Sequence, residues 1–274
     1  MSLVMESPAT PPQSDPQPVV YEAQHISKSF GAVVALRDVS MRLHKGEVLG
    51  LVGDNGAGKS TFIKILTGFH RQDSGDLIFE GQHIHLSSPA DARRLGIQTV
   101  YQDLALIKDL SVYHNMYLGR ELRRWHGLDN RAMKRETVKA LSQLGIKLAS
   151  VDSTVERLSG GQRQSIAVAR SVFSNPKVLF LDEPLAALGV REGRLVLNLI
   201  LELKARGDVS IILIAHNYSQ VFEVCDRISF LSGGKIAYEA NTKDTTVSEL
   251  VDLVSSGYRL GTIPTSTPTD VPPA

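Results

Sequence analysis

The sequence predicts an α/β fold, in which a mainly parallel β-sheet is covered by helices on both faces. Short apolar runs of strand length, such as residues 178–181 and 209–215, alternate with segments of helical periodicity such as residues 191–206. Strands that are buried on both faces read as continuous apolar runs, as these do. A glycine-rich turn at residues 53–61 stands between such a strand and a helix, which predicts a ligand site at the carboxyl edge of the sheet.

The region before this sheet predicts an N-terminal antiparallel β subdomain. Residues 19–26 and 33–43 are expected to form strands that are joined by a turn at residues 28–31, with Phe30 at the tip of the turn. Further elements are expected as a strand at 48–52, a helix at 62–66, a strand at 76–79 and a helix at 89–95 that Ser88 caps.

A helical subdomain is predicted as an insertion in the α/β core, at about residues 103–174. The β-branched runs fade there, and Val138, Leu141 and Leu144 recur at helical spacing before Gly145, a residue typical of helix C-termini. The core is expected to resume with strands at 178–181, 209–215 and 228–231 and with helices at 191–206 and 218–224.

The ends of the chain differ from its middle. Residues 1–18 and 261–274 are rich in Pro, Ser and Thr, so we expect two disordered tails around one folded domain at residues 19–260. No internal repeat is visible, which indicates a single ligand-binding unit. The single cysteine, Cys225, lies in an apolar stretch and is expected to be a small buried side chain.

The composition excludes several classes of protein. With 42% hydrophobic and 22% charged residues and a net charge of +1, the chain has no overall field that favours nucleic acid or an anionic membrane. No apolar run reaches the ~18 residues of a membrane-spanning helix, and the N-terminus has prolines where a signal peptide needs an apolar core. We therefore expect no nucleic-acid partner and no insertion into a membrane.

Residues 53–61 fit the phosphate-loop pattern G-x-x-x-x-G-K-[ST]. The glycines let the backbone form a nest of N–H groups around one anion, and the following helix adds its positive N-terminus. The alternative is a glycine-rich turn without a ligand. The motif predicts a site for a nucleoside triphosphate with Mg²⁺, in which Lys59 adds a charge and Ser60 ligates the metal. The residues expected to bind the nucleotide are Gly53, Asp54, Asn55, Gly56, Ala57, Gly58, Lys59, Ser60 and Thr61.

Two acids, Asp182 and Glu183, end the apolar strand at residues 178–181. Because the carboxyl ends of parallel strands share one edge, these acids should emerge beside the phosphate loop. Asp182 is then placed to hold Mg²⁺, and Glu183 to orient and deprotonate the water that attacks the γ-phosphate. The alternative is a strand that runs into a solvated loop.

A second anion site is predicted at residues 158–162, which read Leu-Ser-Gly-Gly-Gln and open a helix. Ser159 at the N-cap, followed by Gly160 and Gly161, leaves several backbone N–H groups free at a positive helix end. Alone, this pattern could equally be a cap or a linker. The chain has only one nucleotide loop, so the phosphate that would bind here is not apparent from the residues.

The order of these motifs resembles the ATP-binding subunits of ABC transporters. The phosphate loop, Gln102 after a strand at 98–101, residues 158–162, the acid pair and His216 follow one another over roughly residues 19–255. The resemblance implies the P-loop NTPase fold, with ATP and Mg²⁺. It also implies a head-to-tail pair of chains, in which the signature of one chain closes on the ATP held by the other. The signature residues are Ser159, Gly160, Gly161 and Gln162.

Three further roles follow only from this resemblance. Phe30 takes the place of the aromatic residue that stacks on adenine, although it could equally be a turn residue packed on the sheet. Gln102 looks like the glutamine that senses Mg²⁺ and the attacking water and couples the site to the membrane partner. Alone it would be an ordinary polar residue at a strand end. His216 resembles the histidine that contacts the γ-phosphate, whereas a lone histidine after a strand is usually structural or solvated.

The loop after the acid pair departs from the common family pattern. It reads Leu-Ala-Ala-Leu-Gly at residues 185–189, so Gly189 stands where the family usually has an aspartate. Any role that this carboxylate has in the family is therefore not assigned to the present chain. The loop, together with residues 88–92 and 96–103, looks like the ATPases of simple-sugar importers of the ribose, xylose and fructose type. Because this chain has one ATPase unit where many of them have two, a homodimer is implied.

The resulting expectation is an ATP-hydrolysing subunit that powers import of a small solute, with a monosaccharide favoured, through separate transmembrane permease subunits. A solute-binding protein would belong to the same system, and the subunit would lie peripherally at the cytoplasmic face of the inner membrane. The alternatives are a soluble ATPase of DNA repair or ribosomes and a weakly hydrolysing regulatory subunit. A basic cluster at residues 120–126, which contains the single tryptophan, is expected to be a solvated face.

Overall fold

The computed structural model describes residues 17–186 and 188–252. The predicted tails at residues 1–18 and 261–274 lie outside these residues, apart from Gln17 and Pro18. In this part of the chain, no helix is both long and apolar enough to cross a membrane.

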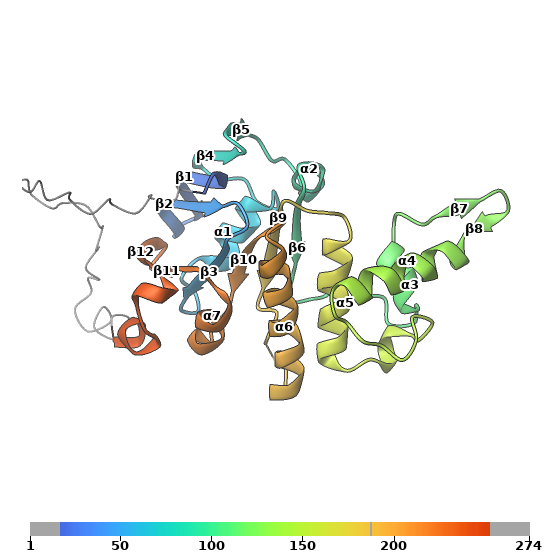
Figure 1. Ribbon diagram of the computed structural model, residues 1–274. Coiled ribbons are helices and arrows are strands. Elements are labelled where there is room, and N and C mark those ends of the chain that lie inside the picture. The colour runs from blue at the N-terminus through green and yellow to red at the C-terminus, as the bar shows by residue number, and fades with distance from the viewer. Residues whose placement is uncertain (1–16, 187, 253–274) are drawn as a thin grey trace, which may run out of the picture.

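A six-stranded sheet forms the centre of the fold, with the strand order β12-β11-β3-β10-β9-β6 (Figure 1). The neighbours from β11 to β6 are parallel, and β12 pairs antiparallel with β11 at one edge. The mainly parallel sheet that the sequence predicts is therefore confirmed, whereas β12 was not predicted. The strands are β3 (Val48–Gly53), β6 (Ile97–Val100), β9 (Val178–Asp182), β10 (Ser210–Ile214), β11 (Arg227–Ser232) and β12 (Lys235–Asn241).

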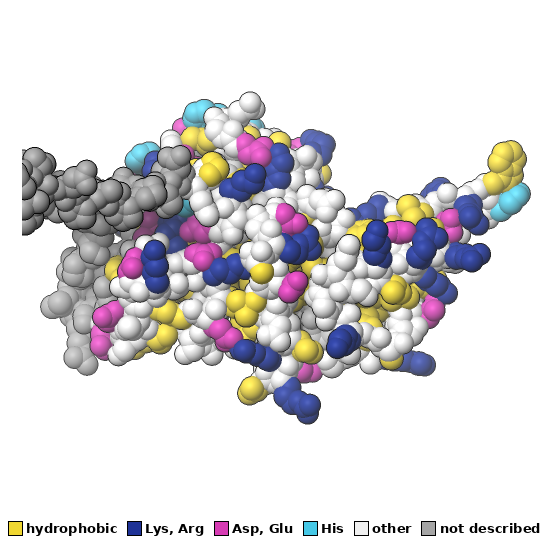
Figure 2. All heavy atoms as spheres, in the orientation of Figure 1, with side chains coloured by type: hydrophobic (Ala, Val, Ile, Leu, Met, Phe, Trp, Pro, Cys, Tyr) yellow, Lys and Arg dark blue, Asp and Glu magenta, His cyan; other side chains and the backbone are white. Residues whose placement is uncertain are grey.

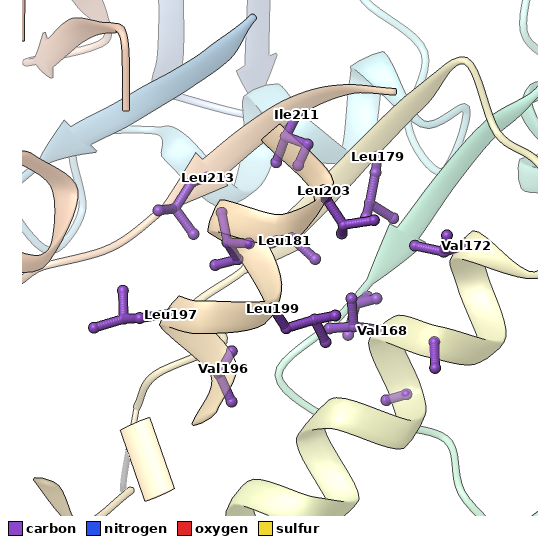
Figure 3. Packing of buried hydrophobic residues seen from close by; sticks show 14 of the residues in the cluster. Val168, Val172, Leu179, Leu181, Val196, Leu197, Leu199, Leu203, Ile211 and Leu213 are labelled. Atoms are coloured by element: carbon purple, nitrogen blue, oxygen red, sulfur yellow. The ribbon is translucent and has the colours of Figure 1, made fainter. Parts of the chain in front are cut away.

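Helices and a second sheet cover the two faces of this sheet. Alternate side chains of each strand enter different cores because the period of a strand is two residues. In β10, Ile211 and Leu213 pack with α6 and α5, whereas Ile212 and Ile214 join the core that contains α1. Figure 3 shows the first of these cores, where Leu179 and Leu181 of β9 lie with side chains of α5 and α6. The helices around the sheet are α1 (Lys59–Leu66), α2 (Pro89–Arg94), α5 (Gly160–Val172), α6 (Val190–Arg206) and α7 (Tyr218–Val224).

The predicted antiparallel β subdomain is a four-stranded sheet with the order β2-β1-β4-β5. Its strands β1 and β2 are longer than predicted, because the turn between them spans only two residues, Gly31 and Ala32. Gly31 has a φ of 59°, which lets the strands pair up to the turn. The prediction that Phe30 lies at the tip of the turn is therefore wrong, since Phe30 is the last residue of β1 and pairs with Val33. The strands are β1 (Val19–Phe30), β2 (Val33–His44), β4 (Ser74–Phe79) and β5 (Gln82–Ile84).

The region predicted as a helical subdomain contains α3 (Val112–Tyr117), α4 (Asn130–Gln143), the short 3₁₀ helix Val155–Arg157 and α5. The buried face of α4 consists of Met133, Thr137 and Leu141. Val138 was expected on this face but is half exposed, because it follows Thr137 by one position and points about 100° away. Gly145, just beyond the C-cap, has a φ of 66°, as a residue after a helix C-terminus commonly does.

A small hairpin, which was not predicted, joins α3 to α4. It consists of β7 (Arg123–Arg124) and β8 (Gly127–Leu128) and projects away from the sheet (Figure 1). Figure 2 shows Lys and Arg side chains spread over this hairpin and α4. The basic cluster that includes Trp125 is thus an exposed turn, except for Arg120, which packs inward.

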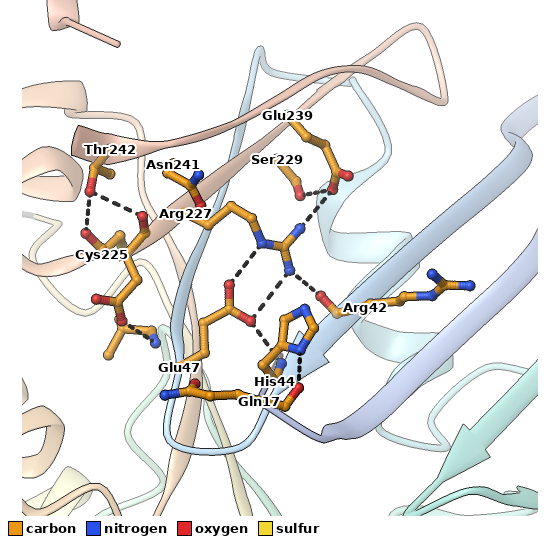
Figure 4. A network of polar contacts seen from close by, with 12 residues as sticks. Gln17, Arg42, His44, Glu47, Cys225, Arg227, Ser229, Glu239, Asn241 and Thr242 are labelled. Atoms are coloured by element: carbon orange, nitrogen blue, oxygen red, sulfur yellow. Dashed lines mark hydrogen bonds and ion pairs between the residues drawn. The ribbon is translucent and has the colours of Figure 1, made fainter. Parts of the chain in front are cut away.

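A polar network fastens the antiparallel sheet to the amino end of the central sheet (Figure 4). Arg227 at the start of β11 pairs with the buried Glu47 at 2.8 Å and also with Glu239 of β12. Its guanidinium donates a further hydrogen bond to the carbonyl of Arg42 in β2. Glu47 in turn accepts from the His44 amide at 2.7 Å. The network lies at the edge opposite to the predicted site, so its part is structural.

Candidate nucleotide site at the carboxyl edge of the sheet

The strand order places the ends of four neighbouring strands side by side. The carboxyl end of β3 leads into the phosphate loop, that of β10 into His216, that of β9 into Glu183 and that of β6 into Gln102. The register pairs Ile214 with Asp182, so that β10 and β9 end at the same level, and with Leu51, two residues before the end of β3. Because all four ends share one edge, residues that are far apart in the sequence meet here.

The phosphate loop has the backbone conformation that its glycines permit. Gly53 and Gly58 have φ values of 148° and 107°, which L side chains rarely adopt. A Cβ atom at Gly53 would lie 2.1 Å from the carbonyl oxygen of Leu231, and one at Gly58 would lie 2.6 Å from that of Ala35. Both positions therefore require glycine for space as well as for conformation. Asn55, Gly56 and Ser60 are exposed, so the concave side of the loop is accessible.

Lys59 lies within this loop. Its Nζ donates to the carbonyl oxygens of Gly53 at 2.6 Å and Asp54 at 2.8 Å, and its side chain is buried. Burial lowers the pKa of the ammonium, whereas the carboxylates of Glu183, Asp54 and Asp182 partly oppose this. The Lys59 ammonium is held by loop carbonyls and faces three carboxylates. It can exchange these carbonyl partners for the oxygens of a polyanion that binds in the loop.

Glu183 and His216 are joined across β9 and β10. His216 Nε2 lies 2.5 Å from Glu183 Oε1, and the Glu183 amide donates to the Ile214 carbonyl at 3.0 Å. Glu183 has a φ of 51°, which is unusual for a residue with a side chain and turns the chain sharply at the end of β9. The arrangement holds one carboxylate in a fixed direction beside an imidazole.

Asp182, at the last position of β9, has no similar hydrogen-bonded partner among the residues that the structure describes. Burial raises the pKa of its carboxyl group, and the charge of Glu183 raises it further, while Lys64, Lys59 and His216 lower it in part. Two carboxylates in this position favour a cation between them and an anionic ligand. Lys64 was not predicted to be near the site. Its position five residues after Lys59 gave no signal, since the two residues point about 140° apart around one short helix.

The donor set fits Mg²⁺. Asp182 supplies a carboxylate, Ser60 an exposed hydroxyl and Gln102 an exposed amide at the end of β6. Among the described residues, no group of three or more His, Cys, Asp or Glu side chains could hold a metal by itself. Mg²⁺ is commonly bound by one or two carboxylates together with phosphate oxygens, so a sparse set of oxygen donors beside a phosphate loop suits this ion.

The signature residues form a regular helix start. Ser159 Oγ accepts from the Gln162 amide at 3.3 Å, and Gln162 Oε1 accepts from the Ser159 amide at 3.0 Å, which makes a capping box. In the described part of the chain, no hydrogen bond or ion pair connects residues 158–162 with residues 53–61. The structure therefore does not bring the signature to the phosphate loop of the same chain.

The signature helix rests on the start of α6 instead. A Cβ atom at Gly161 would lie 2.9 Å from both Cβ and the carbonyl oxygen of Glu192, and one at Gly160 would lie 3.1 Å from the side chain of Leu188. Glu192 also accepts from the Gly189 amide at 3.3 Å. Sequence reasoning missed Glu192, because the capping-box pattern begins with Ser or Thr and the N-cap here is Gly189, which has no side chain.

Phe30 lies on the antiparallel sheet. Its ring is half exposed, meets His70 edge-on at 5.5 Å between centroids and has the Lys28 ammonium 5.5 Å from its centre. The strand that follows its turn passes the phosphate loop, since the carbonyl of Ala35 faces Gly58. The Phe30 ring is therefore accessible, as a base-stacking residue would be.

Comparisons with known proteins identify the family of the chain. The sequence profile of the ABC transporter family matches residues 36–186. The xylose/arabinose import ATP-binding protein of Sulfolobus acidocaldarius is 48% identical over 88% of this chain and 96% of that protein. The fructose import ATP-binding protein of Rhizobium meliloti is 44% identical over 86% and 93% of the two chains. The ribose import ATP-binding protein of Caldanaerobacter subterraneus is 38% identical over 86% of this chain, which spans only 47% of that protein.

Solved structures share the fold. A nucleotide-free ATP-binding cassette from an ABC transporter superposes with a TM-score of 0.74 at 28% identity, over 86% of this chain and 95% of the other. The ADP conformation of another such cassette gives a TM-score of 0.76 at 28% identity, over 88% and 97%. The predicted fold is thereby confirmed, including the antiparallel β subdomain beside the P-loop core.

Proposed function

The chain belongs to the ABC transporter family, and from this we propose that it hydrolyses ATP to power the import of a monosaccharide through separate transmembrane permease subunits. The observation that carries the proposal is the meeting of the phosphate loop, Asp182, Glu183 and His216 at one sheet edge. Relatives that match along nearly their whole length are named as xylose/arabinose and fructose import ATP-binding proteins. These names support an importer over a DNA-repair or ribosomal ATPase.

Binding of ATP begins at the phosphate loop. The amides of residues 53–61 enclose the β- and γ-phosphates, and Lys59 exchanges its bonds to the Gly53 and Asp54 carbonyls for phosphate oxygens. Phe30 stacks on the adenine. Ser60, Asp182 and Gln102 would hold Mg²⁺, which would supply charge neutralisation at the phosphates.

Hydrolysis uses the pair at the ends of β9 and β10. The Glu183 carboxylate orients the attacking water and accepts its proton, while the hydrogen bond from His216 keeps that carboxylate in position. His216 would also contact the γ-phosphate. Catalysis therefore consists mainly of positioning and of charge stabilisation.

The site is completed by a second copy of the chain. Ser159, Gly160, Gly161 and Gln162 of one copy cover the triphosphate held by the other, which explains a signature that lies apart from its own loop. ATP then joins the two copies, and hydrolysis releases them. The dimer sits peripherally at the cytoplasmic membrane face, where it contacts the permease in a system that includes a solute-binding protein.

The concentration dependence of ATP hydrolysis tests this proposal. If two copies share each site, the rate per chain should rise as the protein is concentrated and should level off once the dimer is populated. Lys59→Ala should abolish ATP binding, whereas Lys139→Ala, an exposed position on α4, should leave it unchanged. Undiminished binding by Lys59→Ala, or a rate per chain that is constant over all concentrations, would contradict the proposed site.

A further inference from the structure

The segment between β6 and α3, residues 103–111, has no regular structure but is held at several points. It begins directly after Gln102, one of the residues that we propose to hold Mg²⁺. The buried amide of Asn115 holds its second half, because Asn115 Oδ1 accepts from the Ile107 amide at 2.8 Å and Nδ2 donates to the Ile107 carbonyl at 2.9 Å. Asn115 Nδ2 also lies within hydrogen-bond distance of two later carbonyls of the segment.

The first half of the segment is held by the signature helix. Arg170 of α5 donates through Nη1 to the Ala105 carbonyl at 2.7 Å and through Nη2 to the Leu104 carbonyl at 2.9 Å. These carbonyls lie two and three residues after Gln102. Ala105 has a φ of 50°, so the backbone turns there to present both carbonyls to one guanidinium. Only arginine can make two such bonds at once in a fixed direction.

A second arginine fixes Arg170 itself. Arg120 donates to the Arg170 carbonyl at 2.9 Å and to the Met116 carbonyl at 3.0 Å, and its guanidinium lies 4.8 Å from the centre of the Phe173 ring. Burial lowers the pKa of both arginines, and neither pairs with a carboxylate in the described part of the chain. Two partly buried charges that are held by carbonyls and one aromatic ring, rather than by carboxylates, are costly, which argues for a role of this arrangement beyond stability.

We infer that Arg170 is a positioning residue that couples Gln102 to the signature, so that a displacement at one reaches the other. The inference rests on the proposed roles of Gln102 and of residues 159–162. Arg170 and Ser159 are eleven positions apart on one continuous helix, about 16 Å along its axis. A rigid helix moves as a unit, so a shift of the Leu104 and Ala105 carbonyls displaces the signature that covers the partner's nucleotide.

The test compares Arg170→Lys with Arg135→Lys, an exposed arginine on α4. Lysine keeps the charge but loses the paired bonds, so Arg170→Lys should lower kcat roughly tenfold and leave ATP affinity within about twofold, because positioning errors affect the chemical step most. Arg135→Lys should leave both unchanged. Wild-type kcat in Arg170→Lys would overturn the inference.

A double-mutant cycle separates coupling from general damage. If Arg170 acts through the Gln102 segment, Arg170→Lys should have little further effect on kcat in a Gln102→Ala background. Fully multiplicative effects would refute the coupling. A wild-type chain without ATPase activity would instead refute the proposed function, on which the inference rests.

Hydrogen exchange gives a readout that does not depend on activity. Arg170→Lys should speed amide exchange in residues 103–106, while residues 107–111 keep their protection because Asn115 still holds them. Equal acceleration along the whole segment would indicate a loss of general stability and would contradict the specific role of Arg170.

Discussion

Glu183 Oε1 lies 2.5 Å from His216 Nε2, although the two residues are 33 positions apart in the sequence. The pair depends on the adjacency of β9 and β10, which also fixes the Glu183 backbone through its hydrogen bond to Ile214. The relationship gives the proposed base a defined direction before any ligand binds. A substitution that keeps the shape of the Glu183 side chain and removes only its basicity therefore tests the role of Glu183.

Glu183→Gln should lower kcat by at least about 100-fold, the usual contribution of a general base, while ATP affinity stays within twofold. The amide can still contact His216, so the site should retain its form. Steady-state hydrolysis and light scattering with ATP should show an inactive chain that accumulates as a dimer. Glu202→Gln, an exposed acid on α6, is the control. Retained wild-type turnover in Glu183→Gln would remove this residue from the role of base.

Asp182→Asn should stabilise the free protein at neutral pH and abolish its hydrolysis. The native fold raises the pKa of this carboxyl above its ordinary value of 3.8, so the unfolded chain loses the proton first as pH rises. Wild-type stability therefore falls as the pH rises from 3.8 through the native pKa, whereas the asparagine variant has no such loss.

The difference in Tm between these two proteins, measured without nucleotide, should be present at pH 7 and should shrink toward pH 4. A variant that is less stable than the wild type at pH 7 would show that the fold stabilises the charged Asp182 carboxylate in the absence of nucleotide, which contradicts a raised pKa. Loss of Mg²⁺-dependent hydrolysis in the same variant would accord with its proposed metal role.

Gly189→Asp should be tolerated. Gly189 is the N-cap of α6 and has a φ of −66° and a ψ of 163°, an extended conformation open to any residue. An added Cβ would meet only Glu192 Oε2, at 3.7 Å. Since aspartate is a favourable cap, the stability should rise by a few tenths of a kcal/mol, and turnover should change less than fivefold. A larger gain in turnover would show that the missing carboxylate limits this enzyme.

The two signature glycines should respond differently to alanine. Gly161→Ala brings a methyl group within 3.0 Å of Glu192 Cα and within 2.9 Å of its carbonyl oxygen, so backbone must move and the free energy of unfolding should fall by about 1–3 kcal/mol. Gly160→Ala comes within 3.1 Å of the end of the Leu188 side chain, which can rotate, and otherwise meets only the Glu192 carboxylate oxygens at 3.7 and 3.8 Å, so it should cost less than about 1 kcal/mol.

Denaturant unfolding of both variants measures this difference. Equal losses would contradict the close contact between the starts of α5 and α6. Both variants should bind ATP normally as monomers, because the phosphate loop of the same chain is not in contact with them.

The elements of the central sheet were predictable because buried parallel strands are continuous apolar runs, and β3, β9 and β10 are buried nearly throughout. The β7–β8 hairpin was not, since two-residue strands give no alternation to detect. β12 was missed because its residues are only half buried and mixed in character.

The candidate site shows the same division. Asp182 and Glu183 follow a recognisable strand, so their place at its carboxyl edge could be predicted. The hydrogen bonds from Arg170 to the Leu104 and Ala105 carbonyls could not be predicted, because they join positions about 65 residues apart. Every residue has a backbone carbonyl, so the sequence does not show which carbonyls accept these bonds. The side-chain face of Val138 was misjudged because helical spacing alone does not tell which of two adjacent stripes is buried.

Trp125, the only tryptophan in the sequence, is 93% exposed in the turn between β7 and β8. Its indole is therefore surrounded by water in the folded chain, as it is in the unfolded one. Tryptophan fluorescence should change little when the core unfolds and should not report nucleotide in the phosphate loop, so stability has to be followed by circular dichroism. A blue shift of its emission would signal one event only, the covering of this hairpin.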